Sequence, residues 1–229
     1  MSCILNIDTS TDVCSVAVSD GGACIFTEED HKGPNHNEQI GRMVDAALSF
    51  AESHAIPLDA VAISSGPGSY TGLRIGTSMA KGVCYGRDVK LVAVPTLELL
   101  CVPVLLREQV EEGALLCPMI DARRMEVYAQ VFDRALHVVR PIGADVVTAD
   151  TYRAWLDKQP VYFFGNGAAK CMDTIAHPNA RLIEDVKPLA KNMFPLAERR
   201  IAQGQWEDVA YFEPLYLKDF VAKAAKKLL

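Results

Sequence analysis

Short runs of apolar residues open the chain and predict an antiparallel meander. The first run, residues 4–7, ends at Asp8 and is followed by a polar turn at 9–12. Two more runs, at 13–18 and 23–26, are separated by the sequence Ser-Asp-Gly-Gly. Short apolar runs bounded by Gly, Asp and Ser are typical of β-strands joined by hairpin turns. We therefore expect three antiparallel strands at the start of the chain.

The same pattern returns about halfway along the chain. An apolar run at 115–120 ends at Asp121, a turn follows at 122–125, and further strand patterns lie at 126–132 and 136–139. The two copies align without a gap at one constant offset, which pairs Asp8 with Asp121, Val18 with Val131 and Asp20 with Asp133. This repetition indicates that the chain is built from two related halves.

Each half continues in the same way after its meander. Residues 35–54 carry apolar positions on one helical face and lead to a strand at 61–64 and a Gly-Pro-Gly sequence. Residues 148–157 predict a shorter helix that leads to a strand at 161–164 and a Gly-Asn-Gly sequence. Each Gly-x-Gly opens another helix, and the strands that follow lie at 91–94 and 181–183. The order βββαβαβ, with a helix after it, favours a mixed sheet covered by helices.

The two halves meet near residues 104–113, where acidic and polar residues interrupt the apolar pattern. We therefore expect an N-terminal half over 1–106 and a C-terminal half over 107–229. The pattern leaves open whether the segment after Tyr216 packs back on the first half or trails free.

Hydropathy, cysteine content and net charge limit the kinds of function that the chain can have. No apolar run approaches the ~20 residues of a membrane-spanning helix, and the first residues do not resemble a signal peptide, so we expect no membrane contact. The seven cysteines form no C-x-x-C pair, which favours reduced thiols, a cytoplasmic location and no zinc-thiolate site. Because the formal net charge is −6, we expect any tRNA to be contacted only indirectly, through another subunit. The basic stretch at 218–227 favours a solvated helix end over an RNA contact.

Four motifs connect the repeat to a known family. They are Ile-Asp-Thr-Ser at 7–10, Ser-Gly-Pro-Gly-Ser-Tyr-Thr-Gly-Leu-Arg-Ile-Gly at 65–76, Asp-Ala-Arg-Arg-Met-Glu-Val-Tyr at 121–128 and Pro-Leu-Tyr-Leu at 214–217. The duplicated unit resembles the actin, sugar-kinase and Hsp70 superfamily, and with these motifs the chain resembles the bacterial TsaB (YeaZ) family over nearly its whole length. The resemblance implies an α/β, duplicated actin-like fold (ASKHA, ribonuclease-H-like), in which two βββαβα halves have mixed sheets flanked by helices.

The same resemblance implies a role in making threonylcarbamoyladenosine on tRNA. Members of the family pair with the catalytic subunit TsaD and are needed for its activity, and the ATPase TsaE joins the pair. The resemblance therefore implies that this chain is a non-catalytic accessory subunit with TsaD-like and TsaE-like partners and no cofactor. Such sequences are also called glycoproteases or M22 peptidases. We interpret that label as a misnomer, because the chain has neither His-Glu-x-x-His nor Gly-x-Ser-x-Gly.

The metal site of TsaD-like sequences has no counterpart in this sequence. Those sequences carry two histidines four residues apart on a helix, and such a pair can share one metal ion. The matching positions here are Thr96 and Leu100, and leucine has no lone pair to donate. His31 and His36 lie close in sequence, but no further ligands accompany them. We expect no metal site and no catalytic residue.

The turn after the first strand of each half would wrap phosphates in an actin-like ATPase. The first turn keeps hydroxyls beside Asp8, whereas the second, Ala-Arg-Arg-Met, has no glycine, and its bulky side chains obstruct a close backbone approach. Arg123 and Arg124 could attract an anion, but ion pairs with carboxylates across the cleft are favoured. A vestigial anion or nucleotide cleft would comprise Asp8, Thr9, Ser10, Asp121, Arg123, Gly165 and Gly167.

The glycine-rich segment predicts a helix over 71–85 with Ser69 as its N-cap. Gly72, Gly76 and Ala80 share one face of this helix, and each mid-helix glycine costs ~1 kcal/mol relative to alanine, so a closely packed neighbour is expected. That neighbour could be the helix at 35–54 or another subunit, and the same surface would serve a homodimer when the partner is absent. The predicted partner interface comprises Met43, Ala47, Gly72, Arg74, Gly76, Thr77, Ala80 and Lys81.

Three functions stay open at this point. The first is the accessory subunit that binds and activates a TsaD-like enzyme. The alternative is an actin-like-superfamily ATPase or small-molecule kinase, in which Asp8 and Asp121 would converge on a magnesium nucleotide. The third is a homodimeric interaction module without a link to tRNA.

Overall fold

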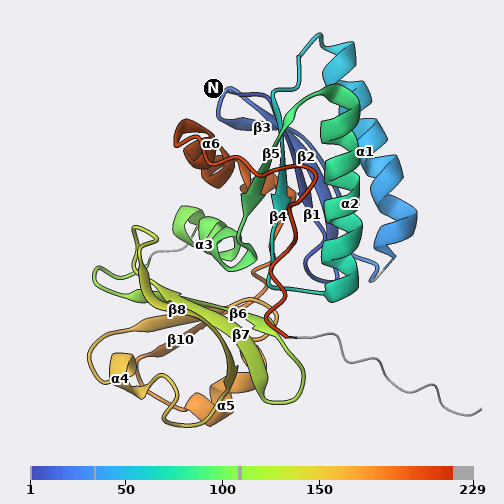
Figure 1. Cartoon of the computed structure of the whole chain (residues 1–229). Helices are drawn as coiled ribbons and strands as arrows, with labels where there is room; N and C mark the ends of the chain where they lie inside the picture. The colour runs from blue at the N-terminus through green and yellow to red at the C-terminus, as the bar shows by residue number, and fades with distance from the viewer. Residues whose placement is uncertain (1, 34, 108–109, 219–229) are drawn as a thin grey trace, which may run out of the picture.

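Two five-stranded sheets, one in each half of the chain, form the framework of the protein (Figure 1). The structure is a computed structural model, which describes residues 2–33, 35–107 and 110–218. The elements of the first half are β1 (Ile4–Asp8), β2 (Cys14–Asp20), β3 (Ala23–Asp30), α1 (His36–Ser53), β4 (Ala60–Ser64), α2 (Tyr70–Arg87), β5 (Lys90–Val94) and α3 (Thr96–Arg107). Those of the second are β6 (Leu115–Asp121), β7 (Glu126–Phe132), β8 (Val138–Val146), α4 (Arg153–Leu156), β9 (Val161–Phe164), the 3₁₀ turn η1 (Ala169–Cys171), α5 (Met172–Ile175), β10 (Ala180–Ile183), η2 (Ala190–Asn192) and α6 (Phe194–Ala202).

The strand order confirms the predicted repeat. The first sheet has the order β3-β2-β1-β4-β5, and the second has the matching order β10-β9-β6-β7-β8 read from its other edge. In each sheet the first three strands of the half pair antiparallel, while the later strands pair parallel. Both sheets are therefore mixed, as expected.

Side-chain alternation along the strands builds a core on both faces of the first sheet. Leu5 and Ile7 of β1 face the cluster formed with α1 and α2, whereas Ile4 faces the cluster formed with α3 and α6. Figure 1 shows α1 and α2 side by side on one face of this sheet and α6 on the other.

The helix α3 lies between the two halves and belongs to both cores. Its Leu99 and Val102 pack with the first sheet, and its Leu97 and Leu100 pack with the second. A helix that is apolar on nearly every side is suited to such a buried position. No described helix is both long enough and apolar enough to cross a bilayer.

The second half differs from the sequence expectation in three places. The expected helix at 148–157 is reduced to α4. The helix expected after Gly-Asn-Gly is reduced to η1 and α5, which end before Pro178. A proline disfavours helical backbone at the residue that precedes it. The expected strand at 136–139 is instead β8, which continues to Val146 despite Pro141 and Gly143. Proline is tolerated there because β8 is an edge strand.

The chain returns to the first half after β10. Met193 and Leu196 of α6 pack on the first sheet, and Leu215 N donates to Ser65 O at 2.8 Å. Residues 207–217 run along the first half as a strap that contains a turn at 209–211 (Figure 1). The prediction for the segment after Tyr216 falls largely on residues 219–229, which lie outside the described residues.

Candidate functional site

The turn after β1 is enclosed by the protein. Asp8, Thr9 and Ser10 are all 0% exposed. Ser10 Oγ donates to the Asp8 carboxylate oxygens at 3.1 and 3.0 Å, and Ser10 N donates to Asp8 Oδ1 at 3.2 Å. Burial raises the pKa of Asp8 to about 7, because it removes water from the charged carboxylate, and the hydrogen bonds from Ser10 oppose this effect only in part.

The start of α2 closes this first turn. Ser69 N donates to Ser10 O at 2.7 Å, and Thr9 Oγ1 donates to Gly72 O at 2.7 Å. A Cβ atom at Gly72 would lie 2.1 Å from Thr9 O, and one at Gly76 would lie 2.2 Å from Thr9 Oγ1. Only glycine allows the helix backbone to approach so closely. The predicted cap is also present, since Ser69 Oγ accepts from Gly72 N at 3.3 Å.

This contact adds to the packing reason expected for the glycines. The sequence suggested that a neighbouring helix, within the chain or in a partner, would lie against Gly72, Gly76 and Ala80. The structure places the turn at Thr9 against the two glycines as the closest neighbour, with Ile63 of β4 also near Gly76. The expected helix is present as well, because a Cβ at Gly72 would lie 3.2 Å from His36 of α1, and Ala80 packs in one cluster with α1 residues.

The turn after β6 is exposed and is held by a lysine. Lys170 Nζ contacts the carboxylate of Asp121 and donates to the carbonyl oxygens of Arg124 and Glu126 at 2.6 and 2.8 Å. Asp121 Oδ1 also accepts from Arg123 N at 2.8 Å. Lys170 therefore places a positive charge inside the turn.

The Gly-Asn-Gly loop packs against the end of β6, next to this second turn. A Cβ at Gly165 would lie 2.4 Å from Met119 O, and one at Gly167 would lie 2.8 Å from Ile120 C. Asn166 Oδ1 accepts from Asp121 N at 3.0 Å. In this structure the two glycines bring the loop against the end of β6.

The expected ion pairs of Arg123 and Arg124 are not formed. Among the described residues, neither side chain makes a salt bridge, and the carboxylate of Asp121 pairs with Lys170 instead. Both arginines have a positive φ, 75° and 50°, so the backbone of the turn is left-handed there. Whether the residues predicted for the anion cleft bind any ligand stays a prediction.

The positions that replace the histidine pair of TsaD-like sequences are buried. Thr96 Oγ1 accepts from Gly66 N at 3.1 Å, and Leu100 packs in the core shared by α3 and the second sheet. Within the ranges the structure describes, no cluster of His, Cys, Asp or Glu side chains has the arrangement of a metal site.

The predicted partner interface divides into buried and accessible residues. Arg74 is exposed, and Lys81 is half-buried with its Nζ donating to Ala210 O at 3.0 Å. The others are buried within the chain and are Met43, Ala47, Gly72, Gly76, Thr77 and Ala80. As folded, these buried residues offer a partner almost no surface, and the interface itself stays a prediction.

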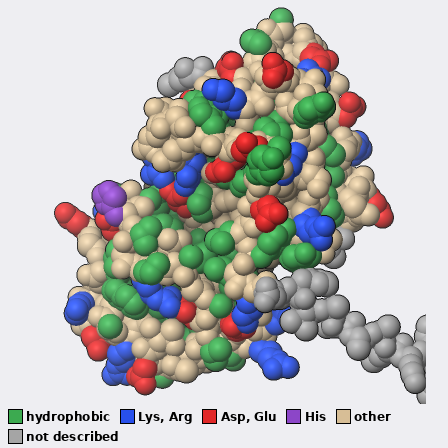
Figure 2. Space-filling view, in the orientation of Figure 1, with side chains coloured by type: hydrophobic (Ala, Val, Ile, Leu, Met, Phe, Trp, Pro, Cys, Tyr) green, Lys and Arg blue, Asp and Glu red, His purple; other side chains and the backbone are tan. Residues whose placement is uncertain are grey.

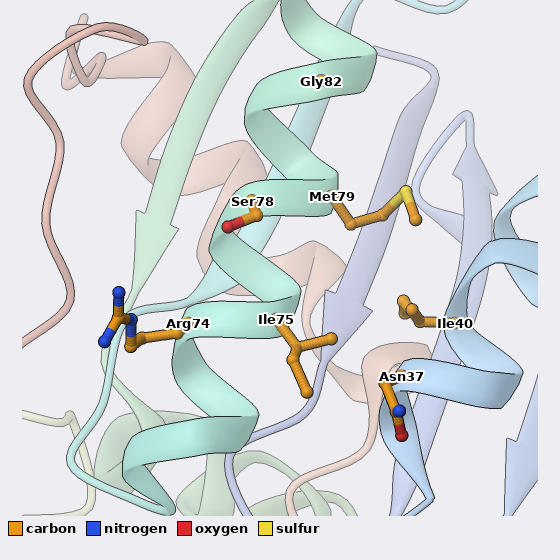
Figure 3. Close-up of a pocket in the computed structure, with 7 residues that line it drawn as sticks. All are labelled: Asn37, Ile40, Arg74, Ile75, Ser78, Met79 and Gly82. Atoms are coloured by element: carbon orange, nitrogen blue, oxygen red, sulfur yellow. The ribbon is translucent and has the colours of Figure 1, made fainter.

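A groove between α1 and α2 offers a more accessible surface. Its volume is about 460 Å³, and it is lined by Asn37, Ile40, Arg74, Ile75, Ser78, Met79 and Gly82. Figure 3 shows Ile75 and Met79 of α2 pointing toward Ile40 and Asn37 of α1, whereas Arg74 and Ser78 project from another side of α2.

Small residues also line the outer side of α2, and the sequence interpretation missed them. Ser78, Gly82 and Gly86 are exposed, and among the described residues no atom outside the backbone of α2 lies within 4 Å of a Cβ built at either glycine. Their four-residue spacing was visible in the sequence beside the inward series. Only the fold shows which of the two series faces the interior.

Comparisons with known proteins agree with the motifs. The model of the family TsaD, described as tRNA N6-adenosine threonylcarbamoyltransferase, matches residues 31–226. The chain is 28% identical to the tRNA threonylcarbamoyladenosine biosynthesis protein TsaB of Escherichia coli, over 96% of each chain. It is 30% identical to the protein of that name from Bacillus subtilis, over 80% of this chain and 76% of the relative.

Solved structures agree with the fold. YeaZ from Pseudomonas aeruginosa superimposes with a TM-score of 0.72 at 24% identity, covering 95% of this chain and all of the other. A structure described as an uncharacterized protein with similarity to peptidase YeaZ, from the same organism, gives a TM-score of 0.77 with the same coverage. With the TsaD match, these structures confirm the predicted duplicated actin-like fold. The chain therefore belongs to the TsaB family, within the wider family that the TsaD model describes.

Proposed function

We propose that this chain is an accessory subunit in the synthesis of threonylcarbamoyladenosine on tRNA, and that it binds and activates a TsaD-like catalytic subunit. Its relatives over most of the chain are named for that biosynthesis. The proposal that the chain is not itself catalytic rests on the closed turn at Asp8, where the start of α2 packs directly on Thr9 and Ser10. The resemblance also implies a TsaE-like ATPase as a further partner and a cytoplasmic location.

The outer side of α1 and α2 is the surface we assign to the TsaD-like partner. An exposed glycine in a helix costs ~1 kcal/mol relative to alanine. In the part of the chain that the structure describes, neither Gly82 nor Gly86 has a neighbour that would require glycine. A smooth helix face allows another helix to approach closely, and the adjacent groove offers Ile75 and Met79 as apolar contacts. The same surface would support a homodimer in the absence of the partner.

Indirect contact with tRNA agrees with the charge of the chain. Phosphate neutralisation by Lys and Arg supplies most of the affinity of RNA-binding proteins, and this chain has a net charge of −6. We therefore assign the tRNA to the catalytic partner.

The main alternative is an actin-like ATPase or small-molecule kinase. It would require Asp8 and Asp121 to hold a magnesium nucleotide together. Asp8 is buried with its pKa raised to about 7, and Asp121 is paired with Lys170. Calorimetry with magnesium ATP separates the two functions, and ATP hydrolysis that disappears in Asp8→Ala would support the kinase.

Size-exclusion chromatography with a TsaD-like protein tests the proposed function. We expect the wild-type chain to co-elute with that protein and Gly82→Arg to lose at least ten-fold in affinity, because the new side chain would separate the packed helices. The variant should still fold, since arginine has a higher helix propensity than glycine. The control is Ala154→Arg, an exposed position on α4, which should bind normally. Co-elution of Gly82→Arg at wild-type affinity would exclude this surface.

A further inference from the structure

A cavity of about 380 Å³ lies between α2 and the end of the strap. Figure 2 shows this face of the first half, where acidic and basic side chains lie close together over the strap and α2. The cavity is separate from the groove between α1 and α2, although the two share a wall of α2. Its polar walls come from Arg74, Thr77, Ser78 and Lys81 of α2 and from Glu213 and Tyr216 of the strap.

The α2 residues of this cavity follow the period of a helix. Thr77 lies three residues after Arg74 and four residues before Lys81, so each cation is about one helical turn from the Thr77 side chain. Ser78 lies four residues after Arg74, and both project from the side of α2 away from α1 (Figure 3). Two cationic and two hydroxyl side chains therefore border one space.

Thr77 carries a buried hydroxyl group without a partner. The residue is 6% exposed, and its Oγ1 atom forms no hydrogen bond within the part of the chain that the structure describes. A buried hydroxyl in this state is costly, because it has lost its hydrogen bonds to water and has gained none in exchange. Since Thr77 lines the cavity, a ligand with acceptor atoms would recover this cost.

The two cations are not neutralised by the described residues. Lys81 Nζ donates to Ala210 O at 3.0 Å, and Arg74 Nη1 donates to the hydroxyl of Tyr70 at 3.2 Å. Neither cation forms an ion pair with a described carboxylate. An ammonium group has three N–H donors and a guanidinium group has five, so most of these donors are available to a ligand. Glu213 borders the same cavity and opposes part of the positive charge, but it is exposed.

This set of donors is suited to a tetrahedral oxyanion. The oxygens of a phosphate group point in different directions, so an ammonium, a guanidinium and a hydroxyl group can each donate to a different oxygen. A carboxylate has two oxygens in one plane and would leave more of these donors unused. The volume lies near the lower end of the range for small-molecule cavities, which favours a compact ligand over a magnesium nucleotide.

We propose that the cavity between α2 and the strap binds a compact phosphate ligand, which is either free phosphate or a small phosphate monoester. Thr77 and Lys81 donate to its oxygens, and Arg74 contributes its charge at the rim. This inference goes beyond the proposed function and does not depend on it, because the ligand is small and its binding is measured on the isolated full-length chain.

Titration calorimetry with inorganic phosphate at constant ionic strength tests the site. We expect a dissociation constant in the millimolar range for the wild-type chain. Thr77→Val and Lys81→Met should each weaken binding about ten-fold, because each removes a hydrogen bond to a charged group. Thr77→Ser keeps the hydroxyl group and should bind as wild type does. Glu213→Gln should strengthen binding about two-fold, since it removes an opposing charge at an exposed position.

Control variants and ligands make the result specific. Lys158→Met removes an exposed cation far along the chain and should leave phosphate binding unchanged. Stronger binding of phenyl phosphate than of phosphate identifies a monoester as the ligand, and weaker binding identifies free phosphate. Magnesium ATP should give no heat of binding.

Three results would overturn the proposal. The first is the absence of phosphate binding to the wild-type chain. The second is equal affinity of wild type, Thr77→Val and Lys81→Met, with each variant shown to be folded by urea denaturation, since phosphate would then bind elsewhere. The third is acetate binding as tightly as phosphate, because the site would then recognise a carboxylate. Thr77→Val should stay folded, because it removes a buried hydroxyl that has no described partner.

Discussion

The turns at Asp8 and Asp121 occupy matching positions in the two halves, yet they are closed in different ways. The first is buried, and the backbone of α2 packs on it through Gly72 and Gly76. The second is exposed, and the side chain of Lys170 holds it by one ion pair and two carbonyl hydrogen bonds. The duplication has therefore preserved the strand order of each half without preserving a common environment for its aspartate.

The difference predicts how each turn responds to substitution. Backbone packing at van der Waals distance has no freedom to accommodate added atoms, whereas a lysine at a partly exposed turn can be replaced in part by water. We therefore expect large effects from changes at the first turn and small ones at the second.

Gly72→Ala should have the largest effect. Its Cβ would lie 2.1 Å from the backbone oxygen of Thr9, so either α2 or the turn must move. We expect a loss of about 3 kcal/mol in the free energy of unfolding, measured by urea denaturation.

The matched control for this variant lies on the same helix. The new Cβ in Gly82→Ala meets no described atom within 4 Å outside the backbone of α2, so the substitution should raise the free energy of unfolding by about 0.5–1 kcal/mol through helix propensity. Equal effects of the two substitutions would show that α2 does not pack on the turn as the structure indicates.

Asp8→Asn should remove one contribution to the pH dependence of the free energy of unfolding. The pKa of Asp8 is raised to about 7 in the folded state, so between its unfolded pKa near 4 and pH 7 the folded protein binds more protons than the unfolded chain. This carboxyl group therefore makes stability fall as pH rises through that window. Relative to wild type, Asp8→Asn should become more stable from pH 5 to pH 8, by up to roughly 3 kcal/mol.

Denaturant titrations at several pH values measure this difference. The variant must be compared with wild type at each pH, because carboxyl groups with lowered pKa, such as Asp133 and Glu29, make stability rise with pH. Asp133→Asn, at a half-buried position, should not reproduce the rise. A difference between Asp8→Asn and wild type that is independent of pH would mean that Asp8 is not buried as a titrating group.

The sequence predicted those parts of the fold that depend on local patterns. The two meanders, the Gly-x-Gly turns and the cap at Ser69 were readable because strand alternation and capping involve residues close in sequence. The strand β8 was predicted too short, since Pro141 and Gly143 are usually breakers and only the sheet order shows that β8 is an edge.

The candidate site was less predictable because its contacts are distant in sequence. The glycine spacing on α2 predicted a close neighbour, but not that the neighbour is a turn some sixty residues earlier, with Thr9 donating to Gly72 O. Lys170 was missed because no local pattern connects it with Asp121, 49 residues away. Two series of small residues on α2 share the same four-residue spacing, and only the fold distinguishes Gly76 from Gly82.

Among the substitutions at the two turns, Lys170→Met should give the smallest effect, and it tests the second turn alone. The lysine side chain is 26% exposed and that of Asp121 is 45% exposed, so water can take over part of the lost contacts, and we expect a loss of about 1–2 kcal/mol. Lys158→Met, at an exposed position, should change stability by less than about 0.5 kcal/mol. Calorimetry of Lys170→Met with magnesium ATP should still show no binding, because the first turn stays closed by α2. If removing this one lysine produced nucleotide binding, the second turn alone would be the barrier, and the closure at Asp8 would no longer explain the absence of catalysis that we propose.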